Sequence, residues 1–226
     1  MPIRQAQIPN QLTPQLELAF QRSISPERWR TYERAAGFNA ESAHRLYLWN
    51  VAVGQSFHFP LQTVEVCLRN VIHLALVDIF GANWASDQHC RNILRPKQVD
   101  DIIKAERRHY SIYAAAATTP QIVASLSLGF WVAMLRKDYN QHIWATHVAH
   151  AFPHLAASET ISHVSRTGTK IQDLRNRIFH QEPLIGQNLS ADYSAILLMI
   201  GWICPEMKAW TRANTSVPRV IRERPR

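Results

Sequence analysis

The chain has 226 residues, of which 46% are hydrophobic and 19% charged, and this composition excludes a disordered or collagen-like protein. Only 7 glycines argue against a turn-rich β architecture. The net charge is +8, and 20 of the 25 basic residues are arginines, whose planar guanidinium matches phosphate oxygens. The charge favours a nucleic-acid partner, although a merely solvated basic surface gives the same total.

The sequence also indicates where in the cell the protein is expected. The longest apolar run, residues 195 to 204, is half the roughly 20 residues that a membrane helix needs, so no membrane association is expected. The first residues lack the apolar segment of a secretory signal peptide. Cys67, Cys90 and Cys204 are far apart in the sequence, which argues against a disulfide framework. We therefore expect a cytoplasmic protein.

Start and stop signals divide the N-terminal half into helices. Thr13-Pro14 and Ser25-Pro26 each place a capping side chain before a proline at the first helical position. A third helix is predicted over residues 40 to 53. Phe59-Pro60 is predicted to start a separate helix up to Gly81, because apolar residues recur there at three- and four-residue spacing: Leu61, Val64, Leu68, Ile72, Ala75 and Ile79.

The C-terminal half continues in the same way. Helices are predicted over residues 96 to 110, 125 to 136 and 137 to 152, the last one stopped by Pro153. One long helix from about residue 157 to Glu182-Pro183 has the apolar seam Ile161, Val164, Ile171, Leu174 and Ile178. After a loop, Ser190 is predicted to cap an apolar last helix, with Asp192 near its positive end.

The predicted organisation is one helical domain with short flanks. No group of period-two apolar runs bounded by turns predicts a sheet. We expect an all-α protein of eight to ten helices, divided into an N-terminal segment (1–25), a helical domain (26–212) and a basic C-terminal tail (213–226). The last eight residues alone carry a charge of +3, and such tails are often solvated.

Three histidines are candidate metal ligands. His147, His150 and His154 are spaced i, i+3 and i+7, which places them on one face of a straight helix. Pro153 interrupts that helix before the third histidine, and no carboxylate or cysteine beside the group completes a zinc site. We therefore expect neither a metal nor a cofactor.

A polar stripe flanks the apolar face of the predicted helix after Pro60. Glu65, Arg69 and His73 are spaced i, i+4 and i+8. They can form an ordinary salt-bridged flank, worth a few tenths of a kcal/mol per pair, or line a polar pocket. The spacing alone leaves both interpretations open.

The third motif lies near the end of the long helix, where Arg175-Asn176-Arg177 is followed by His180. An arginine followed by a histidine after four to six intervening residues is weak evidence alone, since 20 arginines and 11 histidines give about three matches by chance over these three spacings. As a structural arrangement, Arg175 can pair with Glu65 or Glu182, and His180 can bind the last carbonyls of the helix.

The surrounding residues give this motif context. Leu174-Arg-Asn-Arg-Ile-Phe-His-Gln-Glu-Pro-Leu-Ile185 resembles the signature of the Abi-like (abortive infection) branch of the HEPN superfamily. The blocks Leu46 to Asn50, Val64 to His73, Phe80 to Trp84 and Leu126 to Trp131 resemble the same family in the same order. The resemblance covers residues 26 to 202, with one departure, since Gln181 stands where the family would have a second histidine.

The resemblance implies an HEPN-like helical bundle with additional helices, a homodimer and a metal-independent endoribonuclease of phage defence or of a toxin–antitoxin pair. It implies catalytic roles for Arg175 and His180, with support from Asn176. Substrate contacts are implied for Glu65, Arg69, Asn70, His73 and Arg177. RNA is then the expected substrate, and an antitoxin protein a possible partner. Non-catalytic proteins of the same fold bind RNA or protein, and a helical DNA-binding regulator is a third, weaker alternative.

Helical geometry complicates this assignment. At 100° per residue, Arg175 and His180 diverge by about 140° around one straight helix. Either the helix unwinds before Pro183, or the site is composite across a dimer. Arg177 lies three residues before His180 and is a rival for the role of Arg175.

Overall fold

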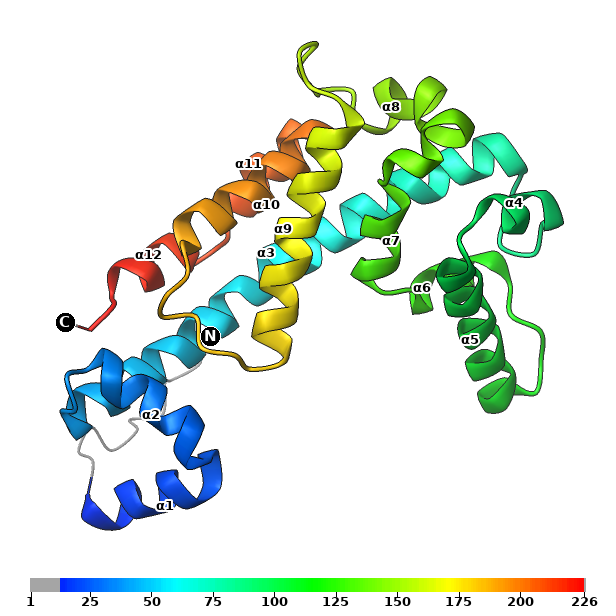
Figure 1. Ribbon diagram of the computed structural model, residues 1–226. Helices are drawn as coiled ribbons and strands as arrows, with labels where there is room; N and C mark the ends of the chain where they lie inside the picture. Colours follow the sequence, from blue (N-terminus) through cyan, green and yellow to red (C-terminus); the bar gives the residue numbers. More distant parts are fainter. Residues whose placement is uncertain (1–12, 226) are drawn as a thin grey trace. The chain divides into compact units, whose positions relative to one another are not determined.

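The computed structural model describes residues 13–225 (Figure 1). Throughout this range the secondary structure is helical, with no strand. This confirms the all-α prediction. Contacts divide the described chain into two compact units: the first comprises residues 13–57, 177–190 and 216–225, and the second comprises residues 58–176 and 191–215. Residues 1–12 of the expected N-terminal segment and Arg226 of the expected tail lie outside the described residues.

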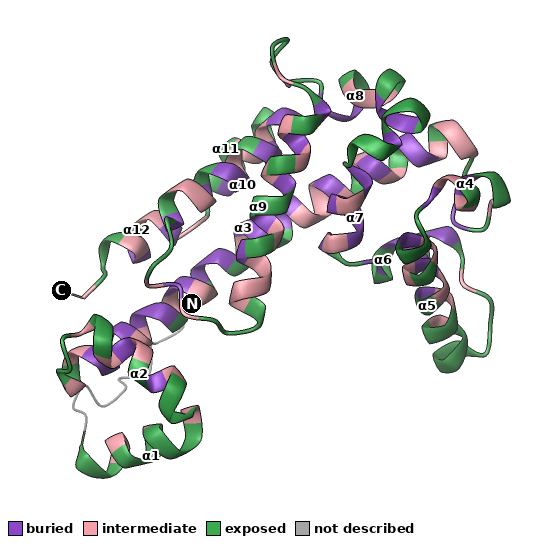
Figure 2. Ribbon diagram, viewed as in Figure 1, coloured by how far each residue is buried: buried purple, intermediate pink, exposed green. Residues whose placement is uncertain are grey.

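The first unit is formed from both ends of the chain. Its helices are α1 (Pro14–Ile24), α2 (Pro26–Ala35), the first part of α3 (Ala40–Phe80), the last turn of α9 (Ile161–Phe179) and α12 (Val217–Arg222). The side chains of Thr13 and Ser25 cap α1 and α2, as predicted. Its aromatic cluster surrounds Trp29 and Tyr32, against which Phe20 and Tyr47 pack. Helix α1 buries no residue (Figure 2).

The second unit contains the remaining helices. They are the rest of α3, then α4 (Gln88–Ile93), α5 (Pro96–Tyr113), α6 (Thr119–Ser125), α7 (Leu128–Met134), α8 (Ala145–Ala151), most of α9, α10 (Leu189–Ile203) and α11 (Pro205–Ala213). Buried Trp84 and Trp131 meet edge to face, with ring centroids 6.5 Å apart. Gly168 lets α9 approach α7, because a Cβ atom there would lie 3.1 Å from Leu135 Cδ1.

The predicted break at Phe59-Pro60 is wrong. Helix α3 is continuous from Ala40 to Phe80 with Pro60 inside it (Figure 1), so the two helices predicted for this region are one. Pro60 has no N–H to offer the preceding turn, but it is buried, as are Phe57 and Leu61 next to it. Tertiary burial offsets the lost hydrogen bond. The predicted seam is confirmed, since Val64, Leu68, Ile72 and Ala75 are also buried.

Two further predictions about helices need correction. Residues 137 to 152 were predicted to form one helix, but a 3-10 turn (Lys137–Tyr139) and a π-turn (Asn140–Trp144) precede α8. Tyr139 in the tighter 3-10 turn and Trp144 in the wider π-turn are both buried, and the indole N–H of Trp144 donates to the Met134 carbonyl at 2.7 Å. Helix α10 begins at Leu189, so Ser190 lies inside its first turn and not at the cap.

The apolar helix predicted to be last is followed by two more. Helix α11 spans Pro205–Ala213, and α12 lies in the stretch expected to be a basic tail. Val217 and Val220 of α12 are buried. The buried indole N–H of Trp49 donates to the Val220 carbonyl at 2.8 Å, and Arg224 lies 5.3 Å above the same ring. These contacts fix the basic segment to the first unit.

No helix among the described residues is long and apolar enough to cross a membrane. The three cysteines are free, in agreement with the absence of a predicted disulfide framework.

Candidate functional site

The end of α9 carries the Arg-Asn-Arg-Ile-Phe-His motif. The helix ends at Phe179, three residues before the predicted stop, through a six-residue closing turn. In this turn the Glu182 N–H donates to the Arg177 carbonyl at 2.8 Å, and the Gln181 N–H donates to the Ile178 carbonyl at 3.0 Å. Gln181 adopts the left-handed conformation, with φ +57°, that such a turn requires. His180 is the residue at which the chain leaves the helix.

Arg28 of α2 reaches this turn. Its Nη2 atom donates to the His180 carbonyl at 3.4 Å, so a guanidinium lies against the helix end where carbonyls lack helical partners. The His180 side chain is exposed, and so is that of Phe179, at 53%. No sequence pattern predicts this pairing, because 152 positions separate Arg28 from His180.

A cavity of about 320 Å³ opens next to the turn within the first unit. Its charged lining residues are Arg28 and Glu182, and its polar ones include Asn50 and Gln181. The Asn50 Oδ1 atom accepts from the Leu184 N–H at 2.7 Å, which fixes the loop after the helix. Burial raises the pKa of Tyr32, a further lining residue, to about 12, so its phenol stays neutral. The cavity thus has one fixed cation and one carboxylate at its mouth.

Arg177, the rival arginine, belongs to the same unit as His180. Its Nη1 atom forms an ion pair with Glu182 at 3.1 Å, and both side chains are more than 40% exposed. An ion pair this exposed to solvent contributes little free energy. Arg177 can therefore exchange Glu182 for another anion at small cost.

Arg175 and Asn176 belong to the second unit. Arg175 is half-buried, and its Nη1 atom donates to the Asn176 Oδ1 atom at 3.4 Å. The side chain of Asn176 thus contacts the neighbouring arginine. Because α9 stays helical through Phe179, any unwinding that redirects the motif begins only at His180.

The stripe Glu65, Arg69, Asn70 and His73 lies on the part of α3 that belongs to the second unit. The structure shows no ion pair between Glu65 and Arg69. The Nδ1 atom of His73 accepts from the buried Trp84 indole N–H at 3.0 Å. Burial, and to a smaller degree Arg69, lowers the pKa of His73. His73 therefore supports the core as a neutral hydrogen-bond acceptor, while Asn70 is exposed.

The three histidines weighed as metal ligands lie around the end of α8. His147 and His150 are in the helix, and His154 follows Pro153. His147 Nδ1 is 2.8 Å from the Thr146 hydroxyl. Within residues 13–225, no group of three or more His, Cys, Asp or Glu residues could hold a metal ion.

Comparisons with models of protein families, with curated proteins and with solved structures each found no match. The function proposed below depends on the residues themselves.

Proposed function

We propose that this protein is a metal-independent endoribonuclease of the Abi-like, HEPN type, acting in phage defence or as a toxin. One observation carries the proposal: the exposed His180 follows the Arg-Asn-Arg motif at a helix end, where Arg28 contacts its main chain beside a 320 Å³ cavity. A proton-transferring side chain and guanidinium groups are the parts that RNA cleavage without a metal requires.

The proposed reaction uses a nucleophile that RNA itself supplies. The 2′-oxygen attacks the adjacent phosphorus as the bond from phosphorus to the 5′-oxygen breaks. Either His180 accepts the proton of the 2′-OH and water protonates the departing 5′-oxygen, or His180 protonates that oxygen and water accepts the 2′-OH proton. The products are a 2′,3′-cyclic phosphate and a free 5′-OH. An arginine stabilises the charge that develops on the phosphoryl oxygens.

Three arginines are candidates for this electrostatic role. The family resemblance assigns it to Arg175, with Asn176 holding that side chain. Arg177 and Arg28 are alternatives, because both belong to the same unit as His180. The exposed ring of Phe179 offers a surface on which an unpaired base can stack.

The proposed assembly is a cytoplasmic homodimer in which a second copy completes the site, held inactive by an antitoxin protein where one exists. Arg175 and His180 point in different directions around one helix, and a composite site would combine Arg175 of one copy with His180 of the other. It also gives the exposed end of α9 a partner.

The test is cleavage of a labelled RNA oligonucleotide by the wild type and by His180→Ala. The wild type should cut in EDTA and leave a 2′,3′-cyclic phosphate, and a 2′-deoxy nucleotide at the cut site should block cleavage. His180→Ala should lose activity, whereas His150→Ala, an exposed histidine on α8, should retain it. Cleavage by His180→Ala at the wild-type rate, or activity that returns only with magnesium, contradicts the proposal.

A non-catalytic RNA-binding protein of the same fold is the second candidate. It is favoured by the basic groove described next, since such a groove binds RNA whether or not the chain cuts it. RNA binding without any cleavage by the wild type would select this alternative.

A further inference from the structure

A second, larger cavity lies wholly within the second unit. It has a volume of about 570 Å³ and lies between the start of α5, α7 and one face of α9. No acidic residue lines it. We name it the basic groove, after its five cationic lining residues: Arg95, Lys97, Arg136, Lys137 and Arg166.

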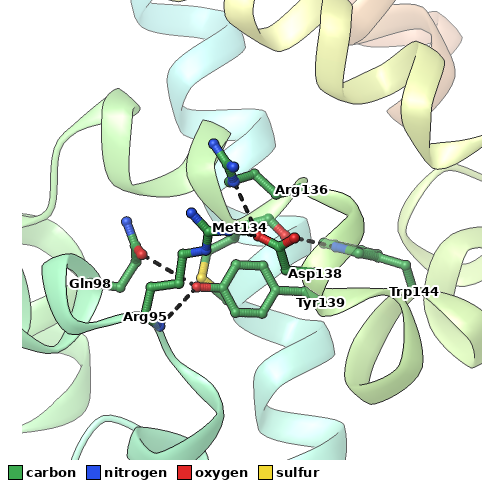
Figure 3. Close-up of polar contacts among 7 residues, drawn as sticks. All are labelled: Arg95, Gln98, Met134, Arg136, Asp138, Tyr139 and Trp144. Carbon is green, nitrogen blue, oxygen red and sulfur yellow. Dashed lines mark hydrogen bonds and ion pairs between the residues drawn. The ribbon is translucent and has the colours of Figure 1, made fainter.

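One carboxylate below the groove holds two of its arginines in place. Asp138 forms ion pairs with Arg95 and with Arg136, whose Nε atom lies 3.3 Å away (Figure 3). The buried Tyr139 hydroxyl accepts from the Arg95 main-chain N–H at 3.1 Å and donates to Gln98 Oε1 at 3.3 Å. A single negative charge between two guanidinium groups leaves a net positive charge with unused N–H donors. Both arginine side chains remain about half exposed.

The start of α5 adds positive charge to the same place. A helix N-terminus carries a partial positive charge, which acidic residues in the first turn usually balance. The first turn of α5 contains no acidic residue, and Arg95 occupies its cap without a capping side-chain hydrogen bond. Lys97 follows at once and pairs with Asp101 one turn later at 3.3 Å. Positive groups that repel one another at a helix end are stabilised together by a bound anion.

The opposite side of the groove is a polar face of α9. Ser162, Ser165, Arg166, Thr169 and Gln172 recur at three- and four-residue spacing and all line the groove. They span eleven residues, or about 15 Å of helix, which is on the order of four phosphates along one strand. Arg166 and Lys137 form no ion pair with any described residue. The groove therefore holds two cations that have no ion-pair partner within residues 13–225.

We propose that the basic groove binds the phosphate backbone of an RNA strand. Binding of a phosphate backbone follows from the charges and hydroxyl donors alone, whereas the choice of RNA rests on the proposed function. The groove has no aromatic lining residue on which a base could stack. Recognition is therefore of the backbone and independent of base sequence.

The test measures binding of a fluorescent 12-nucleotide RNA by anisotropy, on a His180→Ala background so that cleavage does not interfere. Lys137→Glu/Arg166→Glu should weaken binding at least tenfold at 100 mM salt. The milder Lys137→Gln/Arg166→Gln should lower the slope of log affinity against log salt by about 1.4, two contacts at about 0.7 each. The matched control is Arg107→Glu/Arg222→Glu, which reverses two exposed arginines outside the groove and should bind normally.

Each outcome decides one question. If the groove variants and the control bind RNA equally, and circular dichroism shows that all of them are folded, the basic groove is not the RNA-binding site. Equal binding of a DNA of the same sequence overturns the choice of RNA, and tighter binding of polyglutamate would make an acidic protein the partner. If the wild type does not cleave RNA but the groove variants lose RNA binding, the proposed nuclease activity is wrong and the proposed RNA binding by the basic groove is supported.

Discussion

Trp84 is fully buried, and its indole N–H depends on one acceptor, the Nδ1 atom of His73. That nitrogen accepts only when it carries no proton, so the ring must be neutral with its proton on Nε2. Protonation of His73 would leave a buried N–H unpaired, which costs about 1–3 kcal/mol. Burial, and to a smaller degree Arg69, independently lowers the pKa of His73 and so also favours the neutral ring.

The stability of the protein should therefore fall in mild acid. An unfolded histidine titrates near pKa 6.5, whereas burial lowers the pKa of folded His73 and of His44. Between the two values the unfolded chain binds more protons, so stability is complete above about pH 6.5 and is lost as the pH falls through the folded pKa.

The melting temperature, measured from pH 7.5 to pH 5, should decline below pH 6.5. His73→Gln should flatten the decline in part, because His44 still contributes, and His150→Gln should leave it unchanged. A wild-type melting temperature that rises over this range would contradict the assignment.

The arginines near His180 should differ in their contribution to cleavage. Removing one donor to a developing anion typically lowers kcat by about 10²–10³, and we expect this loss for Arg175→Ala. Arg177→Ala should cost less than tenfold in kcat, because the proposal places the donor role on Arg175 and loss of the exposed ion pair with Glu182 costs little stability. Rates of the two variants, measured side by side on one RNA, assign the role. A larger loss of kcat in Arg177→Ala than in Arg175→Ala would assign the charge-stabilising role to Arg177.

Among the elements, the closing turn of α9 places a glutamine in a conformation that favours glycine. At φ +57° an L-residue with a Cβ atom is strained by about 1–2 kcal/mol. Glycine relieves this strain but raises the conformational entropy of the unfolded chain, which offsets part of the gain. Gln181→Gly should therefore stabilise the protein by about 0.5–1 kcal/mol. Gln181→Val should destabilise it. Urea midpoints of the three proteins check the order, and a lower midpoint for the glycine variant would refute it.

The prolines show what local sequence can and cannot predict about helices. Pro14 and Pro26 follow Thr13 and Ser25, whose side chains cap the helices that start there. Pro60 follows Phe59, which has no capping group, but Pro96 and Pro205 also start helices without a side-chain cap, so the local sequence does not separate Pro60 from the prolines that start helices. The 3-10 and π-turns at residues 137–144 are not predictable from local pattern, because the burial of Tyr139 and Trp144 depends on the fold.

The two sites also differ in whether local sequence can predict them. The motif at Arg175–His180 is contiguous, so its spacing and its resemblance to a family bring it to notice. Arg28 lies 152 positions from His180, and Arg95 lies 43 positions from Asp138. Only the fold brings such pairs together. A search by spacing therefore finds neither Arg28 nor the basic groove.

At the scale of the whole molecule, we expect a homodimer with residues 157 to 183 at or near its interface. Light scattering of the wild type at micromolar concentration should give twice the chain mass of 25.9 kDa. A mixture of His180→Ala and Arg175→Ala chains should regain part of the activity if each dimer site combines residues of both copies. A single 25.9 kDa species with full activity would remove the composite site.

The attachment of α12 to Trp49 has a consequence for proteolysis. Trypsin needs an extended, locally opened segment around the arginine it cleaves after, and opening α12 exposes Val217 and Val220 and leaves the Trp49 indole N–H without its acceptor. The Arg219–Val220 bond should therefore resist brief digestion at 25 °C, although it lies in the most arginine-rich stretch of the chain. Trp49→Phe, which removes the hydrogen bond and keeps an aromatic ring, should make the bond cleavable. Mass spectrometry of the fragments turns this one bond into a reporter of whether α12 is packed against Trp49 of α3.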